Sequence, residues 1–262
     1  MTSEKKPPIT DKAYLKALFS ILNRYFARPI NSKGELIELY HKCTNKKNFV
    51  NATRNLIHYL VDRELMDEGV AIKLLNSDFL KAVQTGVREI YLTDKEIVDG
   101  LRLIENKWDR HTLMLYRFLI YTGVRLKPAV EALTNFDKSK LELNGSVAVY
   151  PMTEYSKGKK KNFIAVMPKE FALTLNQLPN YSITTWRSRL NPKKWKPPIK
   201  SRIEPSTIRK WCDNFFVLHN IPESISDFVQ GRSNITVGTK HYLHKRMQAI
   251  EHYKKVIDKF PI

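Results

Sequence analysis

The sequence contains few cysteines and no long apolar run. Cys43 and Cys212 are the 2 cysteines among 262 residues, too few for a disulfide framework or a cysteine metal site. No stretch of about 20 uninterrupted apolar residues occurs, which excludes a membrane-spanning helix. The N-terminal segment also lacks the apolar core of a secretory signal. We therefore predict a protein of the reducing cytoplasm that is not bound to a membrane.

Acidic residues are scarce relative to basic ones. The chain has 26 Asp and Glu against 45 Lys and Arg, a formal net charge of +19 and a pI of about 9.8. Such an excess favours a polyanionic partner, with nucleic acid as the first choice and an anionic membrane surface as the alternative. The hydrophobic fraction of 42% is still sufficient for a sizeable core.

Several catalytic signatures are missing as well. No cluster of carboxylates suggests two-metal nuclease chemistry. Neither a Walker loop nor a dinucleotide-binding fingerprint occurs. We therefore expect neither a metal nor a nucleotide cofactor.

The first third of the chain has a helical pattern throughout. Apolar stripes predict four helices, around residues 15–26, 36–40, 50–61 and 70–75. Basic residues lie between and beside these stripes, from Lys12 to Arg54. They form either the solvated face of a small bundle or a clamp on the DNA backbone. The net charge favours the clamp.

A boundary follows this bundle. Thr85-Gly86 breaks the helical pattern, and Thr93 with Glu96 has the spacing of a capping box that begins a new helix. We predict a helical DNA-binding domain at 1–84, a linker at 85–92 and a catalytic domain at 93–262.

The second domain mixes helices with a small sheet. A strongly apolar helix over 108–121 should end near Gly123, which places Arg125 at a helix–turn–helix junction. Segments 146–152 and 162–167 predict a β-hairpin whose turn is the basic run 157–161. The remaining predicted segments are helices from Pro168 to about Leu178, over 203–219, over 225–230 and over 244–260, with a loop at 191–198. The fold class is mainly α with a small antiparallel β-sheet.

An ordered set of cations ends in a tyrosine. Arg125 lies in Thr-Gly-Val-Arg, Arg209 in Ser-Thr-Ile-Arg-Lys-Trp, and Arg232 in Gln-Gly-Arg, before Lys-His-Tyr at Tyr242. Guanidinium groups bind phosphate oxygens in a planar, two-pronged way. A tyrosine hydroxyl can attack phosphorus once the phosphate is neutralised and oriented. The pattern predicts cleavage of a phosphodiester through a covalent phosphotyrosine.

The order and contexts of these residues resemble the tyrosine recombinases, or phage-type integrases. The similarity covers roughly residues 93–262 and is greatest to integrases of archaeal fuselloviruses and related plasmids, on residues 227–232 and 240–242. It implies that Arg125, Arg209 and Arg232 bind the scissile phosphate and that Tyr242 is the nucleophile. The alternative for each arginine is a surface or DNA-backbone contact. Tyr253 lies inside an amphipathic helix and is expected to be a packing residue.

The general acid is left open by the sequence. The resemblance implies a lysine on the β-hairpin that protonates the departing 5′-oxygen. Lys157 matches the Lys-Gly pattern of bacterial relatives, whereas Lys160 fits the fusellovirus-type spacing better. Lys159 and Lys161 lie in the same turn, and most of these lysines would only contact the DNA backbone.

Two positions depart from the family pattern. Ser206 stands where relatives carry His or Lys, and Pro128 stands where they usually carry an acid. Glu131 is a stand-in for the acid. Three cations near Ser206 are substitutes for the missing base: Lys200, Arg202 and Lys210.

The resemblance implies a site-specific DNA recombinase, the integrase of a mobile element. It would act as a homo-tetramer on double-stranded attachment sites. A type IB topoisomerase and a catalytically inactive DNA-binding relative are the alternatives. Two points stay open: whether Tyr242 attacks in its own active site or a neighbour's, and whether the final helix, 247–260, packs on its own core or on a neighbouring subunit.

Overall fold

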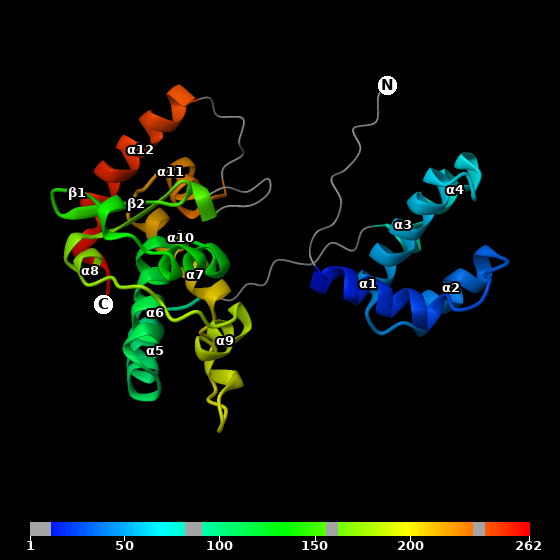
Figure 1. Cartoon of the computed structure of the whole chain (residues 1–262), viewed down its shortest axis with the longest axis horizontal. Helices are drawn as coiled ribbons and strands as arrows, with labels where there is room; N and C mark the ends of the chain where they lie inside the picture. The colour runs from blue at the N-terminus through cyan, green and yellow to red at the C-terminus, as the bar shows by residue number, and fades with distance from the viewer. Residues whose placement is uncertain (1–11, 82–90, 156–161, 233–238) are drawn as a thin grey trace. The chain divides into compact units, whose positions relative to one another are not determined.

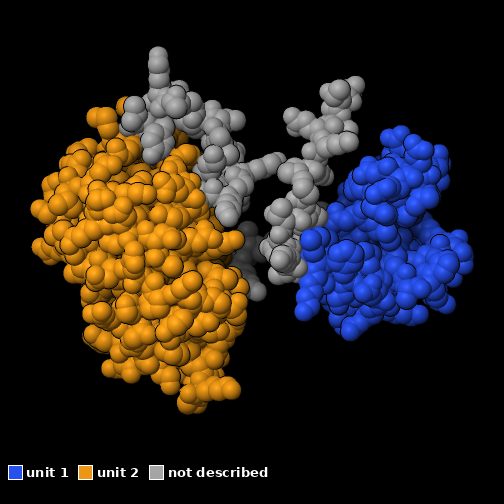
Figure 2. Space-filling view, viewed as in Figure 1, with its two compact units in different colours: residues 1–88 blue, residues 89–262 orange. Residues whose placement is uncertain are grey.

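The structure is a computed structural model. In it the chain forms two compact units, residues 1–88 and 89–262 (Figure 2). It describes residues 12–81, 91–155, 162–232 and 239–262, without the side chains of residues 12–14 and 239–243. Each unit has its own hydrophobic core. The described part is mostly helical with one three-stranded antiparallel sheet, which confirms the predicted fold class.

The first unit is a small helical bundle. Its helices are α1 (Lys12–Tyr25), α2 (Lys33–Lys42), α3 (Lys46–Asp62) and α4 (Glu68–Leu75), followed by the short turn η1 (Asp78–Leu80). Phe49 on α3 is fully buried, and the rings of Tyr25, Phe26 and Tyr40 surround it with centroids 5.7–6.0 Å away. This aromatic cluster joins α1, α2 and α3 into one core.

The predicted apolar stripe of the fourth helix is only partly correct. Ala71 on α4 is buried, but Val70 and Ile72 are 49% and 52% exposed. The helix has eight residues, about two turns, and Leu74 and Leu75 pack against the core of the first unit while Val70 and Ile72 face solvent.

The second unit contains eight helices and the sheet among its described residues (Figure 1). Its helices are α5 (Asp94–Lys107), α6 (Arg110–Thr122), α7 (Leu126–Thr134), α8 (Lys169–Leu173), α9 (Ile183–Arg189), α10 (Pro205–Leu218), α11 (Glu223–Gln230) and α12 (Thr239–Lys254). Short 3₁₀ turns occur at η2 (Lys138–Lys140), η3 (Thr153–Tyr155), η4 (Pro192–Lys194) and η5 (Ile257–Lys259).

The predicted capping box begins this unit. The Thr93 hydroxyl accepts a hydrogen bond from the Glu96 backbone N–H, and the Glu96 carboxylate accepts one from the Thr93 N–H. Two amide donors that the first turn of α5 would leave unsatisfied are thereby paired.

The predicted hairpin is present as β2 (Val147–Pro151) and β3 (Ile164–Pro168), paired antiparallel with Val149 opposite Val166. Its turn, with Lys157 and Lys160, lies outside the described residues. A third strand, β1 (Glu142–Asn144), pairs with β2 and was not predicted. All three residues of β1 are exposed, so the strand has no buried face to produce an alternating pattern.

Two predicted helices have different limits in the structure. The helix after Pro168 ends at Leu173 rather than near Leu178. Helix α12 begins at Thr239, five residues before the predicted start, so Tyr242 lies on it.

The predicted packing role of Tyr253 is confirmed, because its side chain is 1% exposed and its hydroxyl donates to the Tyr121 carbonyl. Met247 was expected in the same stripe but is 68% exposed.

The C-terminal segment packs within its own unit. Phe260 contacts the rings of Phe215 and Tyr253, with centroids 4.4 and 5.6 Å away. Ala249, Ile250 and Val256 are buried in the same core. In the described residues, no helix combines the length and apolar character needed to cross a membrane.

Two glycines end helices in the left-handed conformation. Gly123 caps α6 with φ 60°, and Gly231 caps α11 with φ 67°. A Cβ on Gly231 would lie 1.7 Å from Asn162 Oδ1 and 2.9 Å from Asn162 Cα. A residue with a side chain would therefore be strained in its backbone and would also collide with the base of the β-hairpin.

We predict that Gly231→Ala destabilises the second unit by more than backbone strain alone. Gly145 is the matched control, because its φ is 65° but a Cβ there would meet only Lys254, no closer than 3.6 Å. Gly145→Ala should cost about 1–2 kcal/mol of unfolding free energy and Gly231→Ala at least about 1 kcal/mol more. Urea unfolding of the two variants measures the difference, and equal losses would contradict the predicted collision.

Candidate active site

The three predicted arginines come from three different elements. Arg125 is the N-cap residue of α7, two positions after Gly123, and Arg209 lies in the first half of α10. Arg232 follows Gly231, just beyond the end of α11. All three side chains are half-buried, and we call them the arginine cluster.

Arg209 ties the ends of two helices together. Its Nη1 donates to the carbonyl oxygens of Gly123, at 2.9 Å, and Gln230, at 2.7 Å. These carbonyls lie at the C-termini of α6 and α11, where helix carbonyls lack intrahelical partners and carry partial negative charge. The guanidinium thus satisfies two acceptors and complements two helix dipoles.

Arg125 also donates to a carbonyl oxygen at a helix end. Its Nη1 donates to the Gly231 carbonyl oxygen at 2.8 Å, so the turn after α6 is joined to the turn after α11. Both turns need a glycine, because a Cβ on Gly123 would lie 2.7 Å from Cys212 Sγ and 3.0 Å from the Gln230 side chain. Cys212 itself is fully buried, as predicted for a small core residue.

Arg232 is held by carboxylates. Its Nη1 forms a short ion pair with Asp213 on α10 and lies 3.9 Å from Asp227 on α11. The other carboxylate oxygen of Asp213 accepts a hydrogen bond from the Ser226 hydroxyl at 2.8 Å. Asp213 therefore links the arginine to two helices.

The like charges of the cluster act on one another. Burial, and then the charges of Arg125 and Arg232, lower the pKa of Arg209 to about 9. Burial and the charge of Arg232 also lower the pKa of Arg125. Each arginine is thus within electrostatic reach of the others, although they are 84 and 23 positions apart in the chain. The predicted convergence of the three arginines is present in the structure.

One donor of the cluster is left without an acceptor. The Nη2 atom of Arg209 is buried, and no acceptor among the described residues lies within hydrogen-bonding distance. A buried charged donor without a partner costs on the order of 1–3 kcal/mol or more. The arrangement is therefore suited to an oxyanion, which would supply acceptors and reduce the mutual repulsion of the guanidiniums.

The remaining predicted site residues are less fully described. Tyr242 lies in the first turn of α12, but its side chain is not among those described. Lys157 and Lys160 are in the undescribed turn of the hairpin. Asn162, the first described residue after that turn, lies against Gly231 next to Arg232. The base of the hairpin is thus adjacent to the arginine cluster.

Two of the stand-ins named for the departures from the family pattern make other contacts in the structure. Glu131 lies 4.0 Å from Lys127 on its own helix, and it makes no ion pair with the arginine cluster among the described residues. Arg202 forms two hydrogen bonds to Glu96, at 2.8 and 2.6 Å, and they hold the pKa of that carboxyl at about 2. Ser206 is exposed and donates to Glu204.

Sequence reasoning missed Asp213. The signal that could have found it is its spacing, because Asp213 is four residues after Arg209 on α10, one helical turn away. A carboxylate at that spacing lies on the same helix face as Arg209. Within the described residues, no group of three or more His, Cys, Asp or Glu could hold a metal ion.

A basic groove of about 610 Å³ lies elsewhere in the second unit. The Arg189 guanidinium lies 4.8 Å from the Trp108 ring and 4.7 Å from the Tyr181 ring, and it pairs with Asp109 at 2.6 Å. The groove is lined by Lys107, Trp108, Ser182, Thr184, Thr185, Ser188, Arg189, Lys194, Trp195 and Lys196. Hydroxyls and cations of this kind suit contacts to a phosphate backbone.

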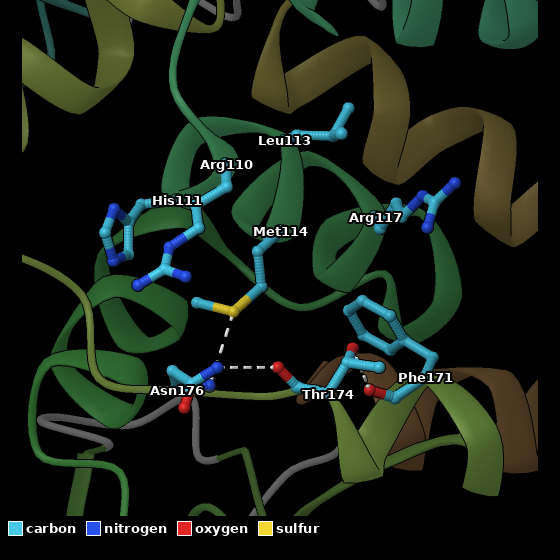
Figure 3. A pocket seen from close by; sticks show the side chains of 8 residues that line it. All are labelled: Arg110, His111, Leu113, Met114, Arg117, Phe171, Thr174 and Asn176. Atoms are coloured by element: carbon cyan, nitrogen blue, oxygen red, sulfur yellow. Dashed lines mark hydrogen bonds between the residues drawn. The ribbon is translucent and has the colours of Figure 1, made fainter.

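A smaller cavity of about 180 Å³ lies between α6 and the segment after α8 (Figure 3). Met114 and Asn176 form part of its wall, and the Asn176 backbone N–H contacts the Met114 sulfur at 3.4 Å. The cavity contains neither a member of the arginine cluster nor Tyr242, so concavity alone does not locate the predicted chemistry.

Comparison with known proteins yields a structural similarity and a family match. The crystal structure of XerA recombinase aligns with 94% of this chain and 98% of its own, at 14% identity and a TM-score of 0.41, a likeness too low to carry an argument. No curated protein sequence matches significantly. The family model of archaeal phage integrases matches residues 89–259, which is more than half of the chain and includes the arginine cluster and Tyr242. The chain therefore belongs to the archaeal phage integrase family, and its function is site-specific recombination of DNA.

Proposed function

We propose that the chain cleaves and rejoins DNA through a covalent 3′-phosphotyrosine at Tyr242. The observation that carries the proposal is the unpartnered, buried Nη2 of Arg209 beside two further guanidiniums. This is a preformed site for one oxyanion. The scissile phosphate is the oxyanion that a DNA recombinase must bind.

In the proposed reaction, Arg125, Arg209 and Arg232 bind the non-bridging oxygens of the phosphate. The phenol of Tyr242 loses its proton to water as its oxygen attacks phosphorus. The bond to the 5′-oxygen breaks, and a hairpin lysine, Lys157 or Lys160, gives that oxygen its proton. Stabilisation by one preorganised donor is worth roughly 3–4 kcal/mol. Religation is the reverse attack by a 5′-hydroxyl, which needs no external energy source because the phosphotyrosine keeps the bond energy.

The wider assembly is also part of the proposal. The helical unit, predicted as residues 1–84, would clamp the DNA backbone with its lysines and arginines, inside the cell of an archaeal virus or plasmid host. A homo-tetramer would hold two attachment sites and exchange strands in pairs. The basic groove of the second unit would contact phosphates away from the reaction centre.

The first test is covalent trapping on a nicked suicide substrate. Wild-type protein should form a protein–DNA adduct, and Tyr242→Phe should form none, because the phenylalanine has no nucleophilic oxygen. Tyr253→Phe is the control, since the Tyr253 hydroxyl is buried against the Tyr121 carbonyl. Denaturing gel electrophoresis measures the adduct. An adduct from Tyr242→Phe, or none from wild type, would overturn the assignment.

The second test uses a small oxyanion. Sulfate at about ten times its Kd should stabilise the full chain by about 1.4 kcal/mol, or a few degrees in Tm. Sulfate also stabilises proteins nonspecifically, so Arg209→Gln is the control and should show a smaller rise. The pKa of Arg209 is lowered to about 9, so its charge is complete near pH 7 and is lost as the pH rises through 9.

The difference between wild type and Arg209→Gln should therefore shrink between pH 8 and pH 10, and thermal unfolding by calorimetry measures it. A specific rise in Tm that persists in Arg209→Gln would place the anion elsewhere.

The third test concerns the basic groove. Replacing the three exposed lysines that line the groove, Lys107, Lys194 and Lys196, by Gln should reduce the slope of the salt dependence of DNA binding by about 1 for each phosphate that the variant no longer binds. Cleavage of bound DNA should be unchanged. A matched variant changes three exposed lysines elsewhere in the unit, Lys95, Lys138 and Lys259. Fluorescence anisotropy measures both slopes. Equal slopes for the two triple variants would contradict a contact between the groove and DNA.

A further inference from the structure

Asp213 occupies a central place in the arginine cluster. It lies on α10 one turn after Arg209, and its carboxylate contacts Arg232 with one oxygen and Ser226 with the other. Gln230 Nε2 is 3.5 Å from the second oxygen. One carboxylate thus joins α10, α11 and Arg232, which lies just beyond the end of α11.

Asp213 holds the Arg232 side chain through one guanidinium nitrogen, Nη1. Among the described residues, the carboxylates of Asp213 and Asp227 are the groups that contact the Arg232 side chain, and both do so through Nη1. The Nε and Nη2 donors of Arg232 are left for another acceptor. Among the described residues, Arg125 and Arg209 are likewise hydrogen-bonded to the protein through Nη1 alone.

The charge of Asp213 also offsets the repulsion within the cluster. The charge of Arg232 lowers the pKa of both Arg125 and Arg209, so the three guanidiniums would separate if only solvent lay between them. Asp213 opposes the lowering of the Arg209 pKa while it pairs with Arg232. Arg125 and Arg209 are fixed by helix carbonyls, so Arg232 is the member whose position depends on an ion pair.

We propose that Asp213 is a positioning residue that holds Arg232 in the orientation required to bind the scissile phosphate. The proposal rests on the proposed function of the arginine cluster and assigns no direct contact with DNA to Asp213. A misplacement of a phosphate ligand by about 1 Å can reduce a rate by about 100-fold. The loss of Asp213 should therefore affect cleavage much more than DNA binding.

The test is single-turnover cleavage of a nicked suicide substrate by the full chain. Asp213→Asn keeps the shape and an acceptor for Ser226, but it presents a neutral amide to Arg232. Cleavage should slow by about 10- to 100-fold, whereas the Kd for DNA changes less than about threefold. Asp99→Asn, which changes a carboxylate paired with Lys95 on α5, is the control and should cleave at the wild-type rate.

A double-mutant cycle separates positioning from a structural role. If Asp213 acts through Arg232, Asp213→Asn should have no further effect on cleavage in an Arg232→Ala background. Multiplicative losses would overturn the proposal, as would cleavage by Asp213→Asn within threefold of wild type. Should Asp213→Asn fold poorly, Ser226→Ala removes the other anchor of the carboxylate and should slow cleavage several-fold by the same route.

A measurement without DNA distinguishes this proposal from the proposed function. The Arg232 Nε–Hε signal in NMR should report a restricted side chain in wild type and an averaged one in Asp213→Asn. If wild type forms no covalent adduct, the recombinase mechanism fails, and this signal then decides whether Asp213 holds Arg232. An Arg232 side chain equally mobile in both proteins would overturn the inference.

Discussion

The second unit keeps three guanidinium groups together against their mutual repulsion. The structure achieves this with acceptors that the fold leaves unsatisfied at the C-termini of α6 and α11. Each helix ends at a left-handed glycine, which turns the chain sharply and presents a carbonyl toward the partner turn. Helix ends that need donors and arginines that need acceptors are thereby satisfied together, which holds the three guanidiniums close to one another.

The helices and the three arginines could be predicted from sequence because their signals are local. The capping box at Thr93, the glycine after α6 and the glycine before Arg232 are short patterns with one physical meaning. The segments around the three arginines were recognisable by their resemblance to a known family. Their convergence could be predicted because all three would bind the same phosphate. The start of α12, thirty positions after Arg209, was not predicted correctly, because no local pattern marks where that helix begins.

What the sequence could not predict depends on contacts between distant segments. Arg202 is drawn to Glu96 across 106 positions, and nothing near either residue indicates that pairing. Strand β1 exists only because β2 lies beside it. Met247 is apolar but exposed, so helical periodicity alone placed it wrongly. Asp213 was overlooked for a similar reason, because its role appears only when α11 lies against α10.

The double hydrogen bond of Arg209 Nη1 has a consequence for the evolution of this chain. Nη1 closes two helix ends, and Nη2 of the same guanidinium is the donor proposed for the phosphate, so folding and the proposed chemistry impose separate requirements on a single side chain. A lysine could restore the positive charge, yet its single ammonium could not keep both carbonyls and still offer a planar second arm. A lineage that lost recombination would therefore still be under selection to retain this arginine. Its presence in an inactive descendant would reflect its role in the fold and would not indicate activity.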